Sequence, residues 1–234
     1  MDTIPQAGVF LLHKPPGPTS HDMVALVRKK TGIKRVGHAG TLDPFATGLL
    51  ILGVDQATKK LAMLVGMDKE YEATLLLGAT STTFDPEGII TPTARSSYSI
   101  PDATSLSPVL DLFRGGYDQR APIFSAKKIN GKKLYDLARA GKATEEMRPV
   151  KRIIISKLHI KQYAFPFLSL TVACSSGTYI RSLADDIGRE LGCGAYLATL
   201  RRTRIGTFCI KDAHTLAELP ISSHSRTLDN ISGK

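Results

Sequence analysis

The most informative stretch of the sequence is Gly37-His38-Ala39-Gly40-Thr41-Leu42-Asp43-Pro44-Phe45-Ala46-Thr47-Gly48. Its glycines and proline predict a loop, in which a ligand can approach the backbone closely and Pro44 restricts the residue before it. A basic run precedes the loop, at residues 28–35, and an apolar run follows it, at 49–54. Asp43 is a candidate nucleophile or general base, because aspartate is ionised at neutral pH. The alternative is an ordinary turn or capping aspartate.

Length and composition indicate a globular protein. The chain has 234 residues, of which 42% are hydrophobic and 22% charged, enough for one large domain or a core with a smaller insertion. No apolar stretch approaches the roughly 20 residues that span a bilayer, and the N-terminus lacks signal-peptide features. Three widely spaced cysteines indicate reduced thiols, with neither disulfides nor a metal site. We therefore expect a cytoplasmic protein without membrane contact.

Charge is sorted along the chain, whose net charge is +10. Residues 120–152 hold ten basic and three acidic side chains, a balance of +7. Residues 68–118 hold eight acidic and three basic side chains, a balance of −5. Such sorting is expected where one face neutralises phosphates, although a solvated charged face is equally compatible.

The hydrophobic pattern predicts interspersed strands and helices. We expect strands over 9–12, 49–53, 71–78, 153–160, 168–174 and 201–208. We expect helices over 20–30, 59–65, 132–140 and 178–191, a helix starting within 101–108, and a helical turn over 214–219. Ser20 is the expected N-cap of the first helix, Gly32 lies just past its end, and Asp85-Pro86-Glu87-Gly88 predicts a turn. Alternating strands outnumber continuously apolar ones. A mixed α+β fold with a mainly antiparallel sheet follows.

Four further features are candidates for function. Arg181 lies in the first turn of an expected helix, where the helix dipole does not favour a cation, so a carboxylate or phosphate partner is indicated. Tyr71 opens a strand and is a candidate for stacking on a base, and His38 is a candidate for contact with nucleotides. The run around Arg201 and Arg202 is a candidate phosphate contact. The alternatives are a solvated arginine, a core tyrosine, an uninvolved histidine and a charge-protected edge strand.

Six motifs together resemble the bacterial tRNA pseudouridine synthase B (TruB) family. They follow one another in the family's order over roughly residues 9–219. They are Lys14-Pro15-x-Gly17-x-Thr19-Ser20, the stretch 37–48, Lys69-x-Tyr71, a segment from Pro122 to Gly141, Ser176-Gly177-Thr178-Tyr179-Ile180-Arg181, and Ala195-Tyr196-Leu197-x-x-Leu200-Arg201-Arg202.

The resemblance implies an isomerase that converts uridine at position 55 in the tRNA T-loop to pseudouridine without metal or organic cofactor. It implies that Asp43 reacts at the sugar or base, that Arg181 pairs with Asp43, and that Tyr71 stacks on the flipped base. It further implies that His38 fills the space which the flipped base leaves. The basic segment at about 120–152 matches an RNA-clamping thumb insertion. The expected RNA-binding residues are Lys14, His38, Thr41, Tyr179, Arg120, Lys127, Lys128, Lys132, Lys133, Arg139, Arg201 and Arg202.

The resemblance also sets expectations for the domains. It predicts one pseudouridine synthase domain over 1–220, including the thumb, followed by a short polar tail over 221–234 without a complete C-terminal PUA-type domain. We expect a monomer that binds the tRNA T-arm. A non-catalytic RNA-binding or tRNA-folding module of the same fold is the alternative function.

Overall fold

The computed structural model describes residues 8–125, 127–129 and 131–218. The chain divides into two compact units, the first formed by residues up to Tyr71 and from Leu200 onward, the second by Glu72–Thr199. Strands β4 (Lys69–Leu77) and β12 (Ala195–Ile205) contribute residues to both units. The predicted tail at 221–234 lies outside the described residues. The prediction of a single domain over 1–220 stays a prediction.

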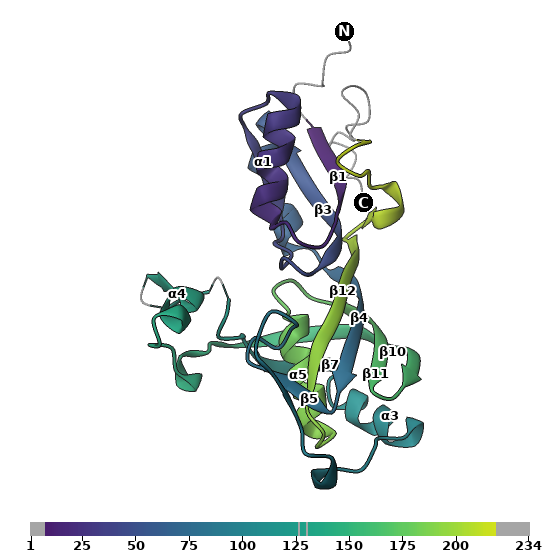
Figure 1. Ribbon diagram of the computed structural model, residues 1–234. Helices are drawn as coiled ribbons and strands as arrows, with labels where there is room; N and C mark the ends of the chain where they lie inside the picture. The colour runs from purple at the N-terminus through teal and green to yellow at the C-terminus, as the bar shows by residue number, and fades with distance from the viewer. Residues whose placement is uncertain (1–7, 126, 130, 219–234) are drawn as a thin grey trace. The chain divides into compact units, whose positions relative to one another are not determined.

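The first unit is a small sheet with a helix packed on each face (Figure 1). Its elements are β1 (Gly8–Lys14), α1 (Ser20–Thr31), β2 (Val36–Ala39), β3 (Thr47–Val54), a 3-10 turn η1 (Asp55–Lys60), α2 (Leu61–Gly66), β13 (Phe208–Cys209) and a 3-10 turn η4 (Ile210–Asp212). β1 and β2 pair antiparallel with β3, whereas β12 pairs parallel with it, with Arg201 opposite Thr47 and Arg202 opposite Gly48.

Alternation along β1 and β3 explains why both faces are covered. Successive strand residues point to opposite faces. Phe10, Leu12, Leu50 and Leu52 pack with Met23, Val24 and Val27 of α1. Val9, Leu11, Leu49 and Ile51 pack in a second cluster with Leu64 of α2. The apolar run after the Asp43 loop is thus the central buried strand of this unit.

Helix α1 begins one residue earlier than its predicted cap implied. Thr19, and not Ser20, is the N-cap: its side chain accepts from the Asp22 amide at 3.0 Å, and the Asp22 carboxylate accepts from the Thr19 amide at 2.8 Å. This reciprocal capping box leaves the Ser20 side chain available to the Asp43 loop. Gly32 ends the helix with φ at 74°, as its position predicted.

The second unit is built on a sheet with strand order β4-β11-β10-β7. Its further elements are β5 (Ala79–Ser81), β6 (Ile90–Pro92), η2 (Arg95–Ser97), α3 (Ala103–Asp111), β7 (Gly115–Arg120), β8 (Lys128–Ile129), β9 (Lys132–Lys133), α4 (Leu134–Arg139), η3 (Glu145–Met147), β10 (Val150–Ala164), β11 (Phe167–Cys174) and α5 (Ile180–Glu190). β10 pairs antiparallel with both β7 and β11. The predicted α+β class with a mainly antiparallel sheet is confirmed.

Several boundaries differ from the prediction. The predicted helix 132–140 starts with strand β9, because Lys132 and Lys133 pair with β8 before α4 begins. The predicted last strand, 201–208, is two strands, and the first begins at Ala195. Residues 216–218 form a turn, while His214 exchanges backbone hydrogen bonds with β1 through Leu11 and His13. None of the helices among the described residues has the length and apolarity to cross a membrane.

Candidate active site

The Asp43 loop joins β2 to β3 and is closed by its own backbone. The amide of Ala46 donates to the Asp43 carbonyl at 3.1 Å, and the amide of Gly17 donates to the Pro44 carbonyl at 2.9 Å. The Ser20 hydroxyl accepts from the Leu42 amide at 2.9 Å. Leu42 is buried, whereas Asp43 is half-buried and Thr41 is exposed. The buried apolar neighbour therefore anchors the loop beside the half-buried Asp43.

Lys14 holds the loop from one side. Its side chain is fully buried, and its ammonium donates to the carbonyls of Pro15, Pro44 and Ala46 at 2.9, 3.0 and 2.7 Å. An ammonium group has three protons. The three carbonyls thus accept one hydrogen bond from each ammonium proton. The expected RNA contact of Lys14 is corrected, because its fully buried side chain holds the loop and does not face RNA phosphates.

Arg202 holds the loop from the other side. Only 1% of the residue is exposed, and its guanidinium donates to the carbonyls of Leu49, Gly40 and Thr41 at 2.8, 2.9 and 3.4 Å. Burial lowers the pKa of the guanidinium, and interactions with Tyr71 and Asp43 oppose that shift. The predicted phosphate contact of Arg202 is likewise corrected, because the side chain points into the protein. Arg201, which precedes Arg202 and lies on the opposite face of β12, is exposed.

Tyr71 is the third residue of β4 and is 8% exposed. Tyr71 interacts electrostatically with Arg202 and raises the pKa of that guanidinium, against the effect of burial. Alternation along β4 places the Tyr71 ring on the buried face with Ala73 and Leu75. Within the first unit, Arg202 therefore interacts electrostatically with both Tyr71 and Asp43.

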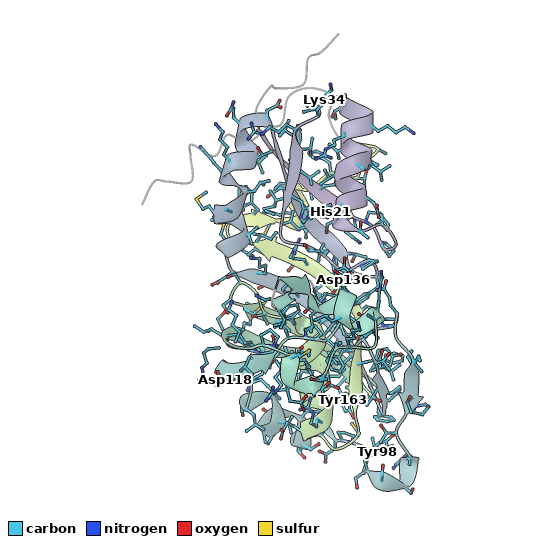
Figure 2. The ribbon with its side chains drawn as sticks, turned by 90° about the vertical axis from the view of Figure 1, so that its left-hand side faces the viewer. His21, Lys34, Tyr98, Asp118, Asp136 and Tyr163 are labelled. Atoms are coloured by element: carbon cyan, nitrogen blue, oxygen red, sulfur yellow. The ribbon has the colours of Figure 1, made fainter. Side chains whose placement is uncertain are left out.

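His38 lies on β2, just before the loop, against a second histidine. The rings of His38 and His21 pack edge to face with centroids 5.2 Å apart. Figure 2 labels His21 at the start of α1, at the end of the helix away from Lys34. Burial lowers the pKa of His38, and the charges of His21 and Arg202 lower it further. Its Nδ1 is buried and has no hydrogen-bond partner within the described part of the chain.

In the second unit, Arg181 is the second residue of α5 and forms a buried ion pair with Asp85. Its Nη1 lies 3.1 Å from Asp85 Oδ2, and its guanidinium donates to the carbonyls of Thr83 and Phe124, each at 3.1 Å. The side chains of Arg181 and Asp85 are 7% and 2% exposed. The sequence indicated a carboxylate or phosphate partner for Arg181, and Asp85 is such a partner. The pairing with Asp43 stays a prediction.

Asp85 was predicted only as a turn residue, and the turn explains how it is held. Its Oδ1 accepts from the Thr83 hydroxyl at 2.5 Å and from the Glu87 amide at 3.0 Å, leaving Oδ2 for Arg181. Phe84 adopts a left-handed φ of 64° between them. A non-glycine residue in this region is uncommon and marks a constrained site. The turn therefore presents one carboxylate oxygen to the arginine.

Tyr179 precedes α5 and is tied to β7. Its amide donates to the Gln119 side-chain oxygen at 2.8 Å, and the Gln119 side-chain nitrogen donates to the Tyr179 carbonyl at 3.0 Å. This two-bond contact fixes the turn that carries Arg181 into its helix. The Tyr179 ring position is half-buried.

The basic segment forms the β8–β9 hairpin and α4. Arg120, Lys127 and Arg139 are exposed, while the side chains of Lys128, Lys132 and Lys133 lie outside the described features. Leu134 is fully buried, and the Tyr135 amide donates to the Ser125 carbonyl at 3.1 Å. Arg148 differs from its basic neighbours: it is 7% exposed and donates to the Ala121 carbonyl at 2.7 Å. The exposed cations of this segment remain candidates for phosphate contact.

Comparisons with known proteins agree with this arrangement. Residues 28–180 match the N-terminal domain model of the TruB family pseudouridylate synthases, and residues 181–229 match the tRNA pseudouridylate synthase B C-terminal domain. A protein from Corynebacterium diphtheriae named tRNA pseudouridine synthase B is 44% identical over 97% of this chain and 77% of its own length. One of the same name from Protochlamydia amoebophila is 44% identical over 91% of this chain and 79% of its own length.

Solved structures show the same fold. A Cbf5-Nop10-Gar1 complex contains a chain with a TM-score of 0.72 and 31% identity, covering 92% of this chain and 54% of that one. An H/ACA RNP bound to a substrate RNA containing 2'-deoxyuridine gives a TM-score of 0.68 and 28% identity, covering 92% and 52%. This chain thus spans about half the length of those two. The match over more than half the chain, together with relatives at 44% identity, shows that the chain belongs to the TruB family of pseudouridylate synthases.

Proposed function

We propose that this protein isomerises uridine to pseudouridine in tRNA, at position 55 of the T-loop, with Asp43 as the reacting carboxylate. The observation that carries the proposal is the loop around Asp43. Two buried cations and the Ser20 hydroxyl hold the backbone of this loop, and Asp43 within it is only half-buried. A rigidly held group that faces the substrate loses little freedom in the transition state, which is what such a reaction requires.

The reaction breaks the bond between C1′ and N1 of the uridine and forms one between C1′ and C5. The uracil turns between the two steps, the proton on C5 is lost, and N1 gains a proton, so no net atom enters or leaves. Asp43 acts either by attack on the sugar or ring or by promoting a glycal intermediate. Either route uses an ionised carboxylate at the reacting centre.

The remaining residues bind and orient the RNA. Tyr71 stacks on the flipped base, His38 fills the space that the base leaves, and Arg181 keeps Asp43 charged when RNA is bound. Extrusion of the base is necessary because C1′ and C5 are otherwise inaccessible inside a folded loop. The proposed RNA contacts are Thr41, Tyr179, Arg120, Lys127, Lys128, Lys132, Lys133, Arg139 and Arg201. The protein acts as a monomer in the cytoplasm on the T-arm.

Tritium release from 5-tritiated uridine in a T-arm RNA tests the proposal, because formation of the new bond at C5 expels the label. We expect release by the wild-type protein and none by Asp43→Asn. Asp68→Asn is the matched control, since Asp68 is an exposed aspartate. An RNA with cytidine at position 55, labelled only at other uridines, should release nothing.

Two outcomes would overturn the proposal. Equal release by wild type and Asp43→Asn contradicts the role of Asp43. Tight T-arm binding with no release from the wild type favours the alternative, a non-catalytic RNA-binding or tRNA-folding module. Binding measured in parallel by fluorescence anisotropy separates the two outcomes.

A further inference from the structure

Arg202 is a buried cation that donates to carbonyls of the Asp43 loop and interacts electrostatically with Tyr71. We propose that Arg202 is a positioning residue, which fixes the Asp43 loop and the Tyr71 hydroxyl in one arrangement. The proposal deepens the proposed function and rests on it. It replaces the phosphate contact that the sequence suggested for this arginine.

The guanidinium spans the loop. It donates to Gly40 and Thr41, just before Asp43, and to Leu49, after it. Two glycines of the loop pack tightly against Arg202. A Cβ on Gly48 would lie 2.3 Å from the Arg202 backbone carbonyl oxygen, and a Cβ on Gly40 would lie 3.3 Å from the Arg202 Nη1. Both glycines have positive φ, 105° and 81°, so a side chain at either position is also strained. The Gly48 contact is with the Arg202 backbone and would persist with any residue at position 202. The loop depends on the side chain through Gly40 and through the three carbonyls that accept from the guanidinium.

The contact with Tyr71 has a direction that chemistry dictates. A guanidinium has five donors and no acceptor. A hydrogen bond between these two side chains therefore has Arg202 as its donor and the Tyr71 oxygen as its acceptor. The positive charge of Arg202 also acts on Asp43. One cation thus orients the phenol and attracts the carboxylate, which are the two groups proposed to meet the uridine.

Lysine would not replace Arg202 at this position. The planar guanidinium donates to three carbonyls in fixed directions, whereas an ammonium group has three donors and acts as a point charge. Arg202→Lys keeps the positive charge and loses the planar set of donors. Arg202→Met keeps much of the apolar part of the side chain and loses both the charge and the donors. The two variants separate geometry from charge.

Kinetics with T-arm RNA give the first test. We expect kcat to fall about tenfold in Arg202→Lys and about 100-fold or more in Arg202→Met, with KM changed by less than about threefold. Arg204→Lys is the matched control, because Arg204 is an exposed arginine on the same strand, and both constants should stay near wild type. A raised KM with unchanged kcat would restore the phosphate-contact hypothesis and overturn the proposal.

Carbon-13 NMR of protein labelled at the tyrosine ring Cζ gives the second test. The Tyr71 resonance is assigned by its disappearance in Tyr71→Phe. We expect it to move in Arg202→Lys and in Arg202→Met and to stay in place in Arg204→Lys. An unmoved Tyr71 resonance in folded Arg202 variants overturns the proposal.

The NMR test requires no activity, so it distinguishes failure of this inference from failure of the proposed function. If the wild-type protein releases no tritium, the proposed function is contradicted, but the effect of Arg202 on the Tyr71 resonance can still be measured. Should Arg202→Met fail to fold, Arg202→Lys carries both tests, with its thermal melt as the check that it is native.

Discussion

The two regions that carry the proposed catalytic residues hold their buried cations in different ways. In the first unit, Lys14 and Arg202 donate to neutral backbone carbonyls. In the second, Arg181 also donates to two carbonyls, but it faces the buried carboxylate of Asp85 as well. Several carbonyls that accept from one cation, here called a carbonyl cradle, restrict the backbone to which they belong. An ion pair instead fixes the side chains of its two partners. The first arrangement suits a loop that must be rigid, and the second suits an arginine that must keep its charge and aim.

The largest effect is expected where removal of one partner leaves a charge buried. Arg181→Met leaves Asp85 uncompensated at 2% exposure. We expect a loss of about 3–5 kcal/mol in the free energy of unfolding, measured by urea denaturation. In Arg181→Met with Asp85→Leu, neither charge remains, so the loss should be smaller than in Arg181→Met alone. A double variant that is less stable than both single variants would contradict the ion-pair interpretation.

Lys14→Met tests the carbonyl cradle and should cost less. Three carbonyls lose their donor, one from a buried hydrogen bond and two from partly buried ones. We expect a loss of about 2–3 kcal/mol, since an unsatisfied buried polar group costs roughly 1–3 kcal/mol and some carbonyls regain partners by relaxation. Hydrogen exchange at the Ala46 amide, which donates within the loop, should accelerate more than exchange in α1. Unchanged exchange at Ala46 would show that Lys14 does not hold the loop.

The contrast also explains which parts of the site the sequence predicted. Asp43 and Arg181 were identified because glycines, proline and a helix start surround them. Asp85 was missed as a partner because nothing in an Asp-Pro-Glu-Gly turn indicates contact with a residue 96 positions later. Arg202 was predicted as a phosphate contact, although a signal for its burial existed. Strand alternation from buried Leu200 predicts Arg201 outward and Arg202 inward. The double arginine obscured this pattern, because buried arginines are rare.

His38 allows a smaller test in the first unit, through pH. Burial lowers its pKa below the usual 6.5, and the charges of His21 and Arg202 act in the same direction. As the pH falls, His38 is protonated in the unfolded chain before it is protonated in the folded protein. The free energy of unfolding is therefore unaffected by His38 above about pH 6.5 and decreases as the pH drops toward the folded-state pKa. His38→Gln should reduce this loss of stability between about pH 7.5 and pH 5.5, measured by thermal melts across that window. The exposed His159→Gln is the control, and an equal effect from both would contradict the prediction.

The smallest effect is expected at an exposed ion pair, which sharpens the contrast with Arg181 and Asp85. Lys161 and Glu72 approach to 2.5 Å, closer than the buried pair at 3.1 Å, yet Lys161 is 56% exposed. Water screens both charges and holding two flexible side chains together costs entropy, so the pair contributes about 0–1 kcal/mol. Lys161→Met should therefore shift the urea midpoint only slightly, and added salt should reduce the difference further. A loss comparable to that of Arg181→Met would mean that distance and not burial decides the energetics of these pairs.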